Sequence, residues 1–199
     1  MNPAVEAGLK SFMPPTNFYH LPPGPDPPRI VNAVIEIQQG GSNKYEYDPE
    51  LGVFRLNRVL YSAVHYPMGY GFVPGTMADD GDPIDILVMT DAPTFTGCLI
   101  ESRPVGLFRM RDEKGEDEKI LSVPAVDPRY DTIQELSDIR PHRLREVEHF
   151  FAIYKELEDK PVEVTGWQDR LAAYDAIATA VQAWRAGRGA ALEVESKKM

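Results

Sequence analysis

Short apolar stretches separated by glycine and proline dominate the chain from Val31 onward. Seven of them have the length of a strand, and most are rich in β-branched and aromatic residues. The predicted strands are Val31–Ile37, Lys44–Asp48, Val53–Leu56, Asp85–Met89, Leu99–Met110, Lys119–Val126 and Val162–Thr165. Short strands at close spacing, with turn residues between them, are typical of a small closed or nearly closed barrel.

Two later segments, Pro141–Glu158 and Trp167–Arg185, carry apolar residues at helical spacing instead. The apolar stripe of the first consists of Leu144, Val147, Phe150, Phe151, Tyr154 and Leu157, and that of the second of Leu171, Tyr174, Ile177, Val181 and Trp184. Recurrence every three or four residues predicts an amphipathic helix with one buried face. We therefore expect two C-terminal α-helices that complete the fold.

The length of 199 residues is sufficient for a single domain with one sizeable core. Residues 1–29 form a proline-rich N-terminal arm, which we expect to be extended and mostly irregular. The predicted core covers residues 30–186. Residues 187–199 form a polar tail, which we expect to fray.

Composition limits the partners and the compartment. The net charge of −10 argues against nucleic acid as the main partner, although a few lysines and a metal ion can still bind small anions. The single cysteine, Cys98, excludes an internal disulfide and fits a reducing compartment. No segment has the length of a membrane span, and the first residues lack the pattern of a secretory signal. We therefore expect a cytoplasmic protein with no membrane partner.

The most informative segment is the turn Asp79–Asp85, which contains four aspartates together with Gly81 and Pro83 and opens an apolar strand. Two carboxylates roughly 5 Å apart repel by about 3 kcal/mol at an effective dielectric constant of 20. A cation relieves this repulsion, and hard oxygen ligands favour Mg²⁺, Mn²⁺ or Ca²⁺ over zinc. A calcium-binding loop would need flanking helices and a glutamate near Pro93, so it does not fit. A solvated acidic turn is the simpler alternative.

A second acidic cluster covers Arg111–Lys119, between two predicted strands. We expect a hairpin centred on Lys114 and Gly115, in which Asp112 and Asp117 face each other across the strands. Like charges in such a pair are destabilising, and a shared metal site would explain them. Taken alone, the cluster also fits a charged hairpin tip that serves only solubility.

Scattered basic and phenolic side chains accompany these acids. They are Lys44, Arg58, Tyr70, Lys119, Tyr154 and Lys155. Each alone is explained by surface charge or core packing. Tyr70, however, lies in a glycine-spaced segment, Tyr66–Pro74, which we interpret as a rigid loop that aims the phenol at a ligand. Carboxylates for metals combined with cations and phenols for anionic oxygens indicate phosphoryl transfer to water, and the chain contains no P-loop.

With these residues in view, the chain resembles the soluble family I inorganic pyrophosphatases of the bacterial type, from about Arg29 to Trp184. Asp80–Asp85 reproduces the signature D-G-D-P-hydrophobic-D, with Tyr-Gly-Phe-Val-Pro upstream and Asp-x4-Asp-x-Lys downstream. Further matches are Val34–Ile37, Lys44–Glu46, Arg58, Arg103–Gly106, Phe150-Phe151, Tyr154-Lys155 and Val164–Trp167.

The resemblance implies an α+β, mainly β fold: a five-stranded OB-type barrel with two C-terminal α-helices packed on it. The implied reaction is the Mg²⁺-dependent hydrolysis of pyrophosphate to two orthophosphates, with several Mg²⁺ ions in each active site and Mn²⁺ as a possible substitute. Chains of this length in the family form homohexamers, so the resemblance also implies a homo-oligomer.

The resemblance assigns the acidic residues to metals and to the attacking water. Asp80, Asp85 and Asp117 would hold the first metal ion, with Asp85 bridging to a second. A water between the two ions would attack the substrate, and Asp82 would be the general base that accepts its proton. Asp112 and Asp117 would bind the metal ion that arrives with pyrophosphate.

The remaining candidates support the metals or bind the substrate. By the same resemblance, Glu36 and Glu46 would support the metal ligands. The side chains that would contact the phosphate oxygens are Lys44, Arg58, Tyr70, Lys119, Tyr154 and Lys155. These groups would also stabilise the leaving phosphate, and Tyr154 is counted with Asp82 as catalytic.

Two other classes of function compete with the pyrophosphatase. One is a metal-dependent phosphohydrolase of similar architecture that acts on a nucleotide or another phosphoanhydride; relative rates on pyrophosphate and ATP separate the two. The other is a non-catalytic OB-type module that binds single-stranded nucleic acid. Such modules favour basic grooves with stacking aromatics, which the charge of −10 does not support.

Overall fold

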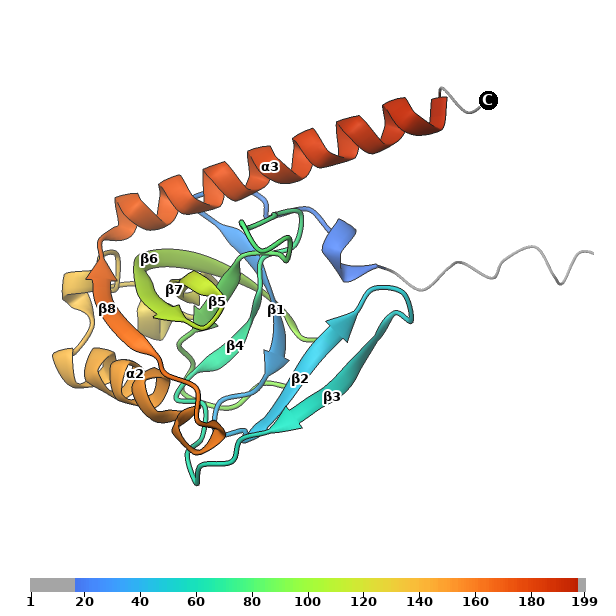
Figure 1. Cartoon of the computed structure of the whole chain (residues 1–199). Helices are drawn as coiled ribbons and strands as arrows, with labels where there is room; N and C mark the ends of the chain where they lie inside the picture. Colours follow the sequence, from blue (N-terminus) through green and yellow to red (C-terminus); the bar gives the residue numbers. More distant parts are fainter. Residues whose placement is uncertain (1–16, 197–199) are drawn as a thin grey trace, which may run out of the picture.

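The computed structural model describes residues 17–196, and its centre is a closed barrel of five strands (Figure 1). The ring consists of β1 (Val31–Ile37), β4 (Gly69–Phe72), β5 (Asp85–Val88), β7 (Gly115–Pro124) and β6 (Leu99–Asp112), in that order. Pairing of β1 with β6 closes the ring. All neighbours are antiparallel except β5 and β7, which run parallel. The predicted five-stranded barrel is confirmed.

Two further sheet elements extend the barrel. Strand β8 (Glu163–Gln168) pairs with the long strand β6. Strands β2 (Asn43–Asp48) and β3 (Val53–Val59) form a separate hairpin, which lies to the lower right of the barrel in Figure 1. This hairpin follows β1 directly and carries part of the candidate site.

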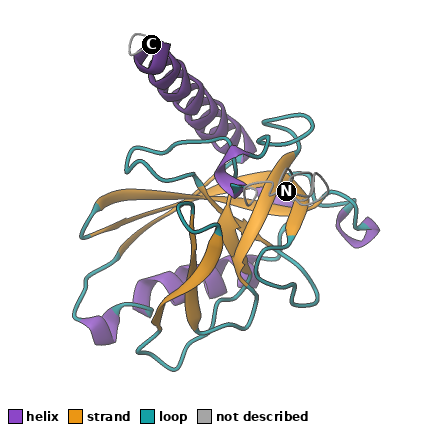
Figure 2. Cartoon of the chain, turned by 90° about the vertical axis from the view of Figure 1, so that its right-hand side faces the viewer, coloured by secondary structure: helices purple, strands orange, loops and turns teal. Residues whose placement is uncertain are grey.

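The two helices of the C-terminal part are α2 (Pro141–Ile153) and α3 (Arg170–Ser196). Short 3₁₀ helices cover Phe18–His20, Pro128–Tyr130, Leu136–Asp138 and Glu156–Glu158. Figure 2 shows that α3 continues well beyond the strands. No helix in the described part of the chain has both the length and the apolarity that crossing a membrane would require.

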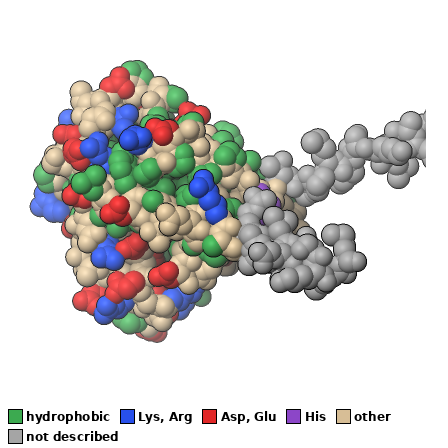
Figure 3. Space-filling view, turned by 90° about the horizontal axis from the view of Figure 1, so that it is seen from above, with side chains coloured by type: hydrophobic (Ala, Val, Ile, Leu, Met, Phe, Trp, Pro, Cys, Tyr) green, Lys and Arg blue, Asp and Glu red, His purple; other side chains and the backbone are tan. Residues whose placement is uncertain are grey.

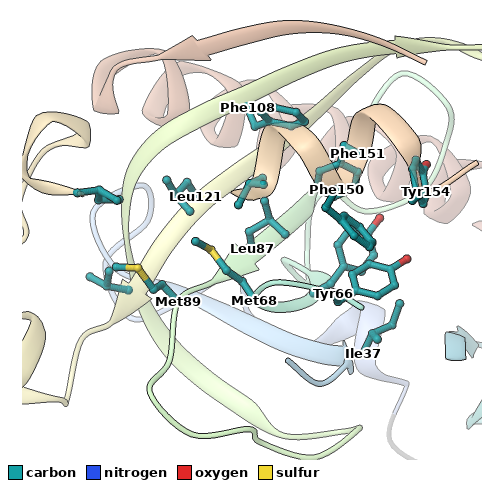
Figure 4. Packing of buried hydrophobic residues seen from close by; sticks show 14 of the residues in the cluster. Ile37, Tyr66, Met68, Leu87, Met89, Phe108, Leu121, Phe150, Phe151 and Tyr154 are labelled. Atoms are coloured by element: carbon teal, nitrogen blue, oxygen red, sulfur yellow. The ribbon is translucent and has the colours of Figure 1, made fainter. Parts of the chain in front are cut away.

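The barrel wall is covered on both faces, because side chains alternate along each strand. Leu87 belongs to a buried cluster with Phe150 and Phe151 of α2, whereas its neighbour Ile86 belongs to a second cluster with Ile177 of α3. Figure 4 shows the first cluster, in which the aromatic rings of α2 lie beside the strand residues. The predicted packing of both helices against the barrel is therefore confirmed.

The ends of both helices differ from the prediction. Helix α2 ends at Ile153, and a 3₁₀ turn follows, so Leu157 is 62% exposed and does not extend the apolar stripe. Trp167 lies in β8 rather than in a helix, and Leu171 is also exposed. Helix α3 continues to Ser196, so most of the tail predicted to fray is helical.

The segment Tyr66–Pro74, predicted as a loop, contains strand β4. Two of its four residues are glycines, which disfavour strands, and the strand forms because β1 and β5 pair with it on both sides. At its centre, a side chain on Gly71 would overlap the carbonyl oxygen of Val34 in β1. Glycine is therefore required there for the close approach of β1 and β4.

The N-terminal arm packs on the barrel from residue 17 onward; the rest of the predicted arm, residues 1–16, lies outside the described residues. The ring of Phe18 contacts that of Tyr47, with centroids 5.1 Å apart. The Asn32 side-chain amide donates to the Pro22 carbonyl oxygen at 2.9 Å.

The space-filling view in Figure 3, seen from above, shows acidic and basic side chains interspersed with apolar ones.

Replacing Gly71 by alanine tests the tight β1–β4 contact. We expect Gly71→Ala to lower the free energy of unfolding by about 3 kcal/mol, because the added methyl group must displace backbone. The matched control is Gly69→Ala in the same strand, where the new methyl would meet its nearest atoms at 3.4 Å, an ordinary contact. Urea unfolding measures both variants. Equal stability of the two variants would contradict this packing.

Candidate active site

One cavity of about 1020 Å³ collects every candidate residue of the sequence analysis. Its lining includes Glu36, Lys44, Glu46, Arg58, Tyr70, Asp80, Asp82, Asp85, Asp112, Asp117, Lys119, Tyr154 and Lys155. These residues come from the β2–β3 hairpin, from the barrel strands and their connections, and from the segment after α2. The barrel thus brings side chains more than a hundred residues apart into one site.

The parallel pairing of β5 with β7 sets the centre of the site. Asp85, the first residue of β5, lies in register with Lys119 of β7. The Lys119 ammonium donates to Asp85 Oδ2 and to Asp117 Oδ1, each at 2.7 Å. From β4, the Tyr70 hydroxyl donates to the same Asp85 oxygen at 2.5 Å. Two carboxylates are therefore held near one buried cation.

The charges of this centre follow from its surroundings. Lys119 is only 2% exposed; burial acts to lower the pKa of its ammonium, but Asp85 and Asp117 raise it above its ordinary value. Burial and the Asp85 charge also raise the pKa of Tyr70 well above that of a free phenol. At neutral pH both groups carry their protons, so both are donors to anionic oxygens.

The second lysine, Lys155, connects the segment after α2 to the β6–β7 hairpin. Its ammonium donates to Asp112 Oδ2 at 2.6 Å and to Glu113 Oε2 at 3.1 Å. Asp112 also accepts the backbone N–H of Lys114 at 2.8 Å. Burial acts to raise the pKa of Asp112, but these hydrogen bonds hold it below its usual range.

The predicted pairing of Asp112 with Asp117 is wrong. Asp112 lies opposite Gly115, and Asp117 lies opposite Met110. The reason is the turn, which consists of Glu113 and Lys114 and shifts the register from the predicted one. Each carboxylate has its own lysine instead of facing the other, although both line the cavity.

Glu36 reaches the cavity through an irregularity in β1. The register of β1 against β4 shifts between Ile35 and Ile37, which is the effect of a β-bulge, and Glu36 lies within that shift. Its Oε1 accepts the backbone N–H of Tyr47 at 2.8 Å. Burial, followed by the Asp85 charge, raises the pKa of Glu36 to about 8, although the bond from Tyr47 lowers it.

The β2–β3 hairpin contributes Lys44, Glu46 and Arg58. The Lys44 ammonium donates to Glu46 Oε1 at 2.7 Å, and the side-chain amide of Asn57 donates to Glu46 Oε2 at 2.6 Å. Both Glu46 oxygens therefore already accept hydrogen bonds.

In the acidic turn, Asp82 donates its backbone N–H to Asp80 Oδ1 at 3.1 Å, and the positive φ of +90° at Gly81 permits this tight turn.

Tyr154 combines the two interpretations given to it from the sequence. Its ring packs against Phe150 and Phe151, with centroids 5.5 and 5.4 Å away, so it belongs to the core (Figure 4). It also lines the cavity, and the Lys155 ammonium lies 5.5 Å from its ring centroid. The core thus fixes the position of a phenol at the site.

Several polar lining residues were not found from the sequence, among them Tyr19, Asn57, Glu113 and Lys160. Tyr19 comes from the N-terminal arm, where the proline-rich composition gave no sign of a contact with the site. The acid-rich hairpin signalled Glu113 only as one charge among several. Lys160 and Asn57 carry no motif, and their contacts depend on the tertiary fold.

The donor set fits a hard divalent cation, because the acidic lining offers only carboxylate oxygens. Among the described residues, however, no three His, Cys, Asp or Glu side chains already converge as a metal site. The lysines explain this arrangement: Lys119 takes oxygens of Asp85 and Asp117, and Lys155 takes one of Asp112. A bound metal would compete with these ammonium groups for the same oxygens.

Comparison with known proteins identifies the group to which this fold and site belong. The model of the inorganic pyrophosphatase family matches residues 33–185, which is most of the chain. The chain belongs to the inorganic pyrophosphatase family. The resemblance derived from the D-G-D-P signature is thereby confirmed, and with it the prediction of an enzyme.

Curated relatives and solved structures agree with the family. An inorganic pyrophosphatase of a Nostoc species is 53% identical over 147 residues, which is 74% of this chain and 87% of the relative. That of Thermus thermophilus is 46% identical over 172 residues, or 85% of this chain and 98% of the relative. The crystal structure of the Thermus thermophilus inorganic pyrophosphatase has a TM-score of 0.83 at 45% identity, covering 85% of this chain and 99% of that one.

Removing the central lysine tests the electrostatics of the site. We expect Lys119→Met to lower the free energy of unfolding by about 3 kcal/mol at pH 7 with EDTA present, because it leaves Asp85 and Asp117 without their buried cation. Urea unfolding measures this loss. The control is Lys114→Met at the exposed hairpin tip, for which we expect a change within about 0.5 kcal/mol. Equal stability of both variants would show that Lys119 does not offset the carboxylate charges.

Proposed function

We propose that this chain hydrolyses inorganic pyrophosphate to two orthophosphates in a Mg²⁺-dependent reaction. The observation that carries the proposal is the cavity in which Lys119 is buried between Asp85 and Asp117, within the fold of the inorganic pyrophosphatase family. A cavity with alternating carboxylates and cations suits a substrate that is itself anionic and accompanied by metal ions.

The acidic residues would hold the metal ions. Asp80, Asp85, Asp112 and Asp117 would be the ligands, with Glu36 and Glu46 in support. Bound Mg²⁺, or Mn²⁺ in its place, would activate a water as nucleophile and screen the charge of pyrophosphate. Asp82 would accept a proton from that water. The water oxygen would then bond to one phosphorus while the bond from this phosphorus to the bridging oxygen breaks.

The basic and phenolic residues would bind the substrate from several sides. Lys44 and Arg58 come from the β2–β3 hairpin, Tyr70 and Lys119 from the barrel, and Tyr154 and Lys155 from the segment after α2. Pyrophosphate carries charge on both phosphoryl groups, so contacts from three directions orient both. Donors placed around the leaving phosphate would stabilise the charge that develops there, and Tyr154 would take part in this step.

The proposal includes the assembly and the location inferred from the family resemblance. The protein would work as a homo-oligomer, a hexamer by resemblance, in the cytoplasm. Pyrophosphate would be its small-molecule partner. The net charge of −10 supports neither nucleic acid nor an anionic membrane surface as a further partner.

Orthophosphate release from pyrophosphate tests the function directly. We expect fast release with Mg²⁺, no release above background after EDTA, and a kcat for Asp82→Asn that is about 10² to 10⁴ times lower, because the variant lacks the base. The matched control is Asp131→Asn, an exposed aspartate that does not line the cavity; its kcat should equal that of the wild type.

Two outcomes would contradict the proposed reaction, and a third would contradict only the role of Asp82. Absence of release by the wild type with Mg²⁺ would remove pyrophosphate as the substrate. Faster release from ATP than from pyrophosphate would favour the nucleotide phosphohydrolase instead. Unchanged turnover in Asp82→Asn would retain the reaction but exclude Asp82 as its base.

A further inference from the structure

The side chain of Arg58 has one ion-pair partner among the described residues, the mostly buried acid Glu158. Its Nε lies 3.4 Å from Glu158 Oε1, and both atoms are buried without a hydrogen bond. The side chain of Glu158 is 7% exposed. Arg58 lines the cavity, whereas Glu158 is not part of the lining. The ion pair therefore joins a residue of the cavity lining to an acid outside that lining.

Glu158 also contacts a second cation. Its Oε2 accepts a hydrogen bond from the Lys160 ammonium at 3.3 Å, and Lys160 lines the same cavity. Lys160 in turn lies 3.7 Å from Glu113, which accepts from Lys155. The chain of ion pairs thus connects the β2–β3 hairpin, the segment after α2 and the β6–β7 hairpin.

The backbone at this point supports the double contact. Glu158 ends the 3₁₀ helix, and Asp159 follows with a φ of 55°, in the left-handed region that aspartate tolerates better than most residues. The left-handed residue turns the backbone, and the side chains of Glu158 and Lys160, two residues apart, contact each other. Glu158 belongs to no motif of the sequence analysis, and only the tertiary structure brings it to Arg58.

We propose that Glu158 is a positioning residue that holds Arg58 in the orientation in which it binds the substrate. This inference rests on the proposed function. A buried carboxylate paired with the Nε of a guanidinium restricts its rotation, and the two terminal nitrogens can then bind an anion. Arg58 is the only side chain of β3 proposed here to contact the phosphates. Its ion pair with Glu158 connects it to the segment after α2 and would fix its orientation.

A double-mutant cycle in the full-length protein tests the inference. Glu158→Gln retains the shape and removes the charge; we expect KM for pyrophosphate to rise about tenfold, with a smaller change in kcat. In the Arg58→Met background, the same substitution should change kcat/KM less than threefold, because the group that it positions is absent. Glu156→Gln, an exposed glutamate of the same turn, is the matched control and should match the wild type.

Thermal unfolding and ligand binding separate positioning from a structural role. Equal losses from Glu158→Gln in both backgrounds, accompanied by a lower Tm, would overturn the inference, as would an unchanged KM. Calorimetric binding of methylenediphosphonate, which cannot be hydrolysed at its carbon bridge, gives a second readout: Glu158→Gln should bind it about tenfold more weakly. If the wild type binds this analogue but releases no orthophosphate, the proposed function fails while the positioning is still tested.

Discussion

The buried lysine between two aspartates is the interaction on which the candidate site depends. Lys119 contacts Asp85 and Asp117 at 2.7 Å. It reaches Asp85 because β5 and β7 run parallel with the two residues in register, and Asp117 lies two residues before it on β7. Without a cation, carboxylates gathered at one end of a barrel would repel one another and destabilise the fold. The same charges that destabilise the protein alone are suited to binding metal ions, so lysine and metal are alternative partners for one set of oxygens.

Much of the fold could be predicted from the sequence, because β-branched runs and helical periodicity are local signals. Strand β1 matches its predicted bounds, and both helices lie near their predicted segments. Strand β4 could not be predicted, since Gly69-Tyr-Gly-Phe forms a strand only through its neighbours in the closed ring. The end of α2 also escaped prediction: Leu157 continues the apolar spacing, but the chain turns away after Ile153.

The candidate site shows the same division between local and tertiary information. The composition of the D-G-D-P turn and of the acidic hairpin identifies their residues as candidates from the sequence. All of the sequence candidates line one cavity. The predicted pairing of Asp112 with Asp117 was wrong because the register depends on which two residues, Glu113 and Lys114, form the turn. Glu158 and Lys160 were missed because their importance lies in contacts with Arg58 and Glu113, which no local pattern encodes.

The central claim is that the carboxylates around Lys119 form a metal site for phosphoryl transfer. Anomalous diffraction from crystals soaked in Mn²⁺ tests it most directly. Mn²⁺ gives a stronger anomalous signal than Mg²⁺ and binds the same oxygen ligands. The account predicts anomalous peaks between the carboxylates of Asp80, Asp85 and Asp117, with Lys119 displaced from at least one of its partners. Peaks confined to surface carboxylates elsewhere, or Lys119 unmoved with no peak in the cavity, would contradict it.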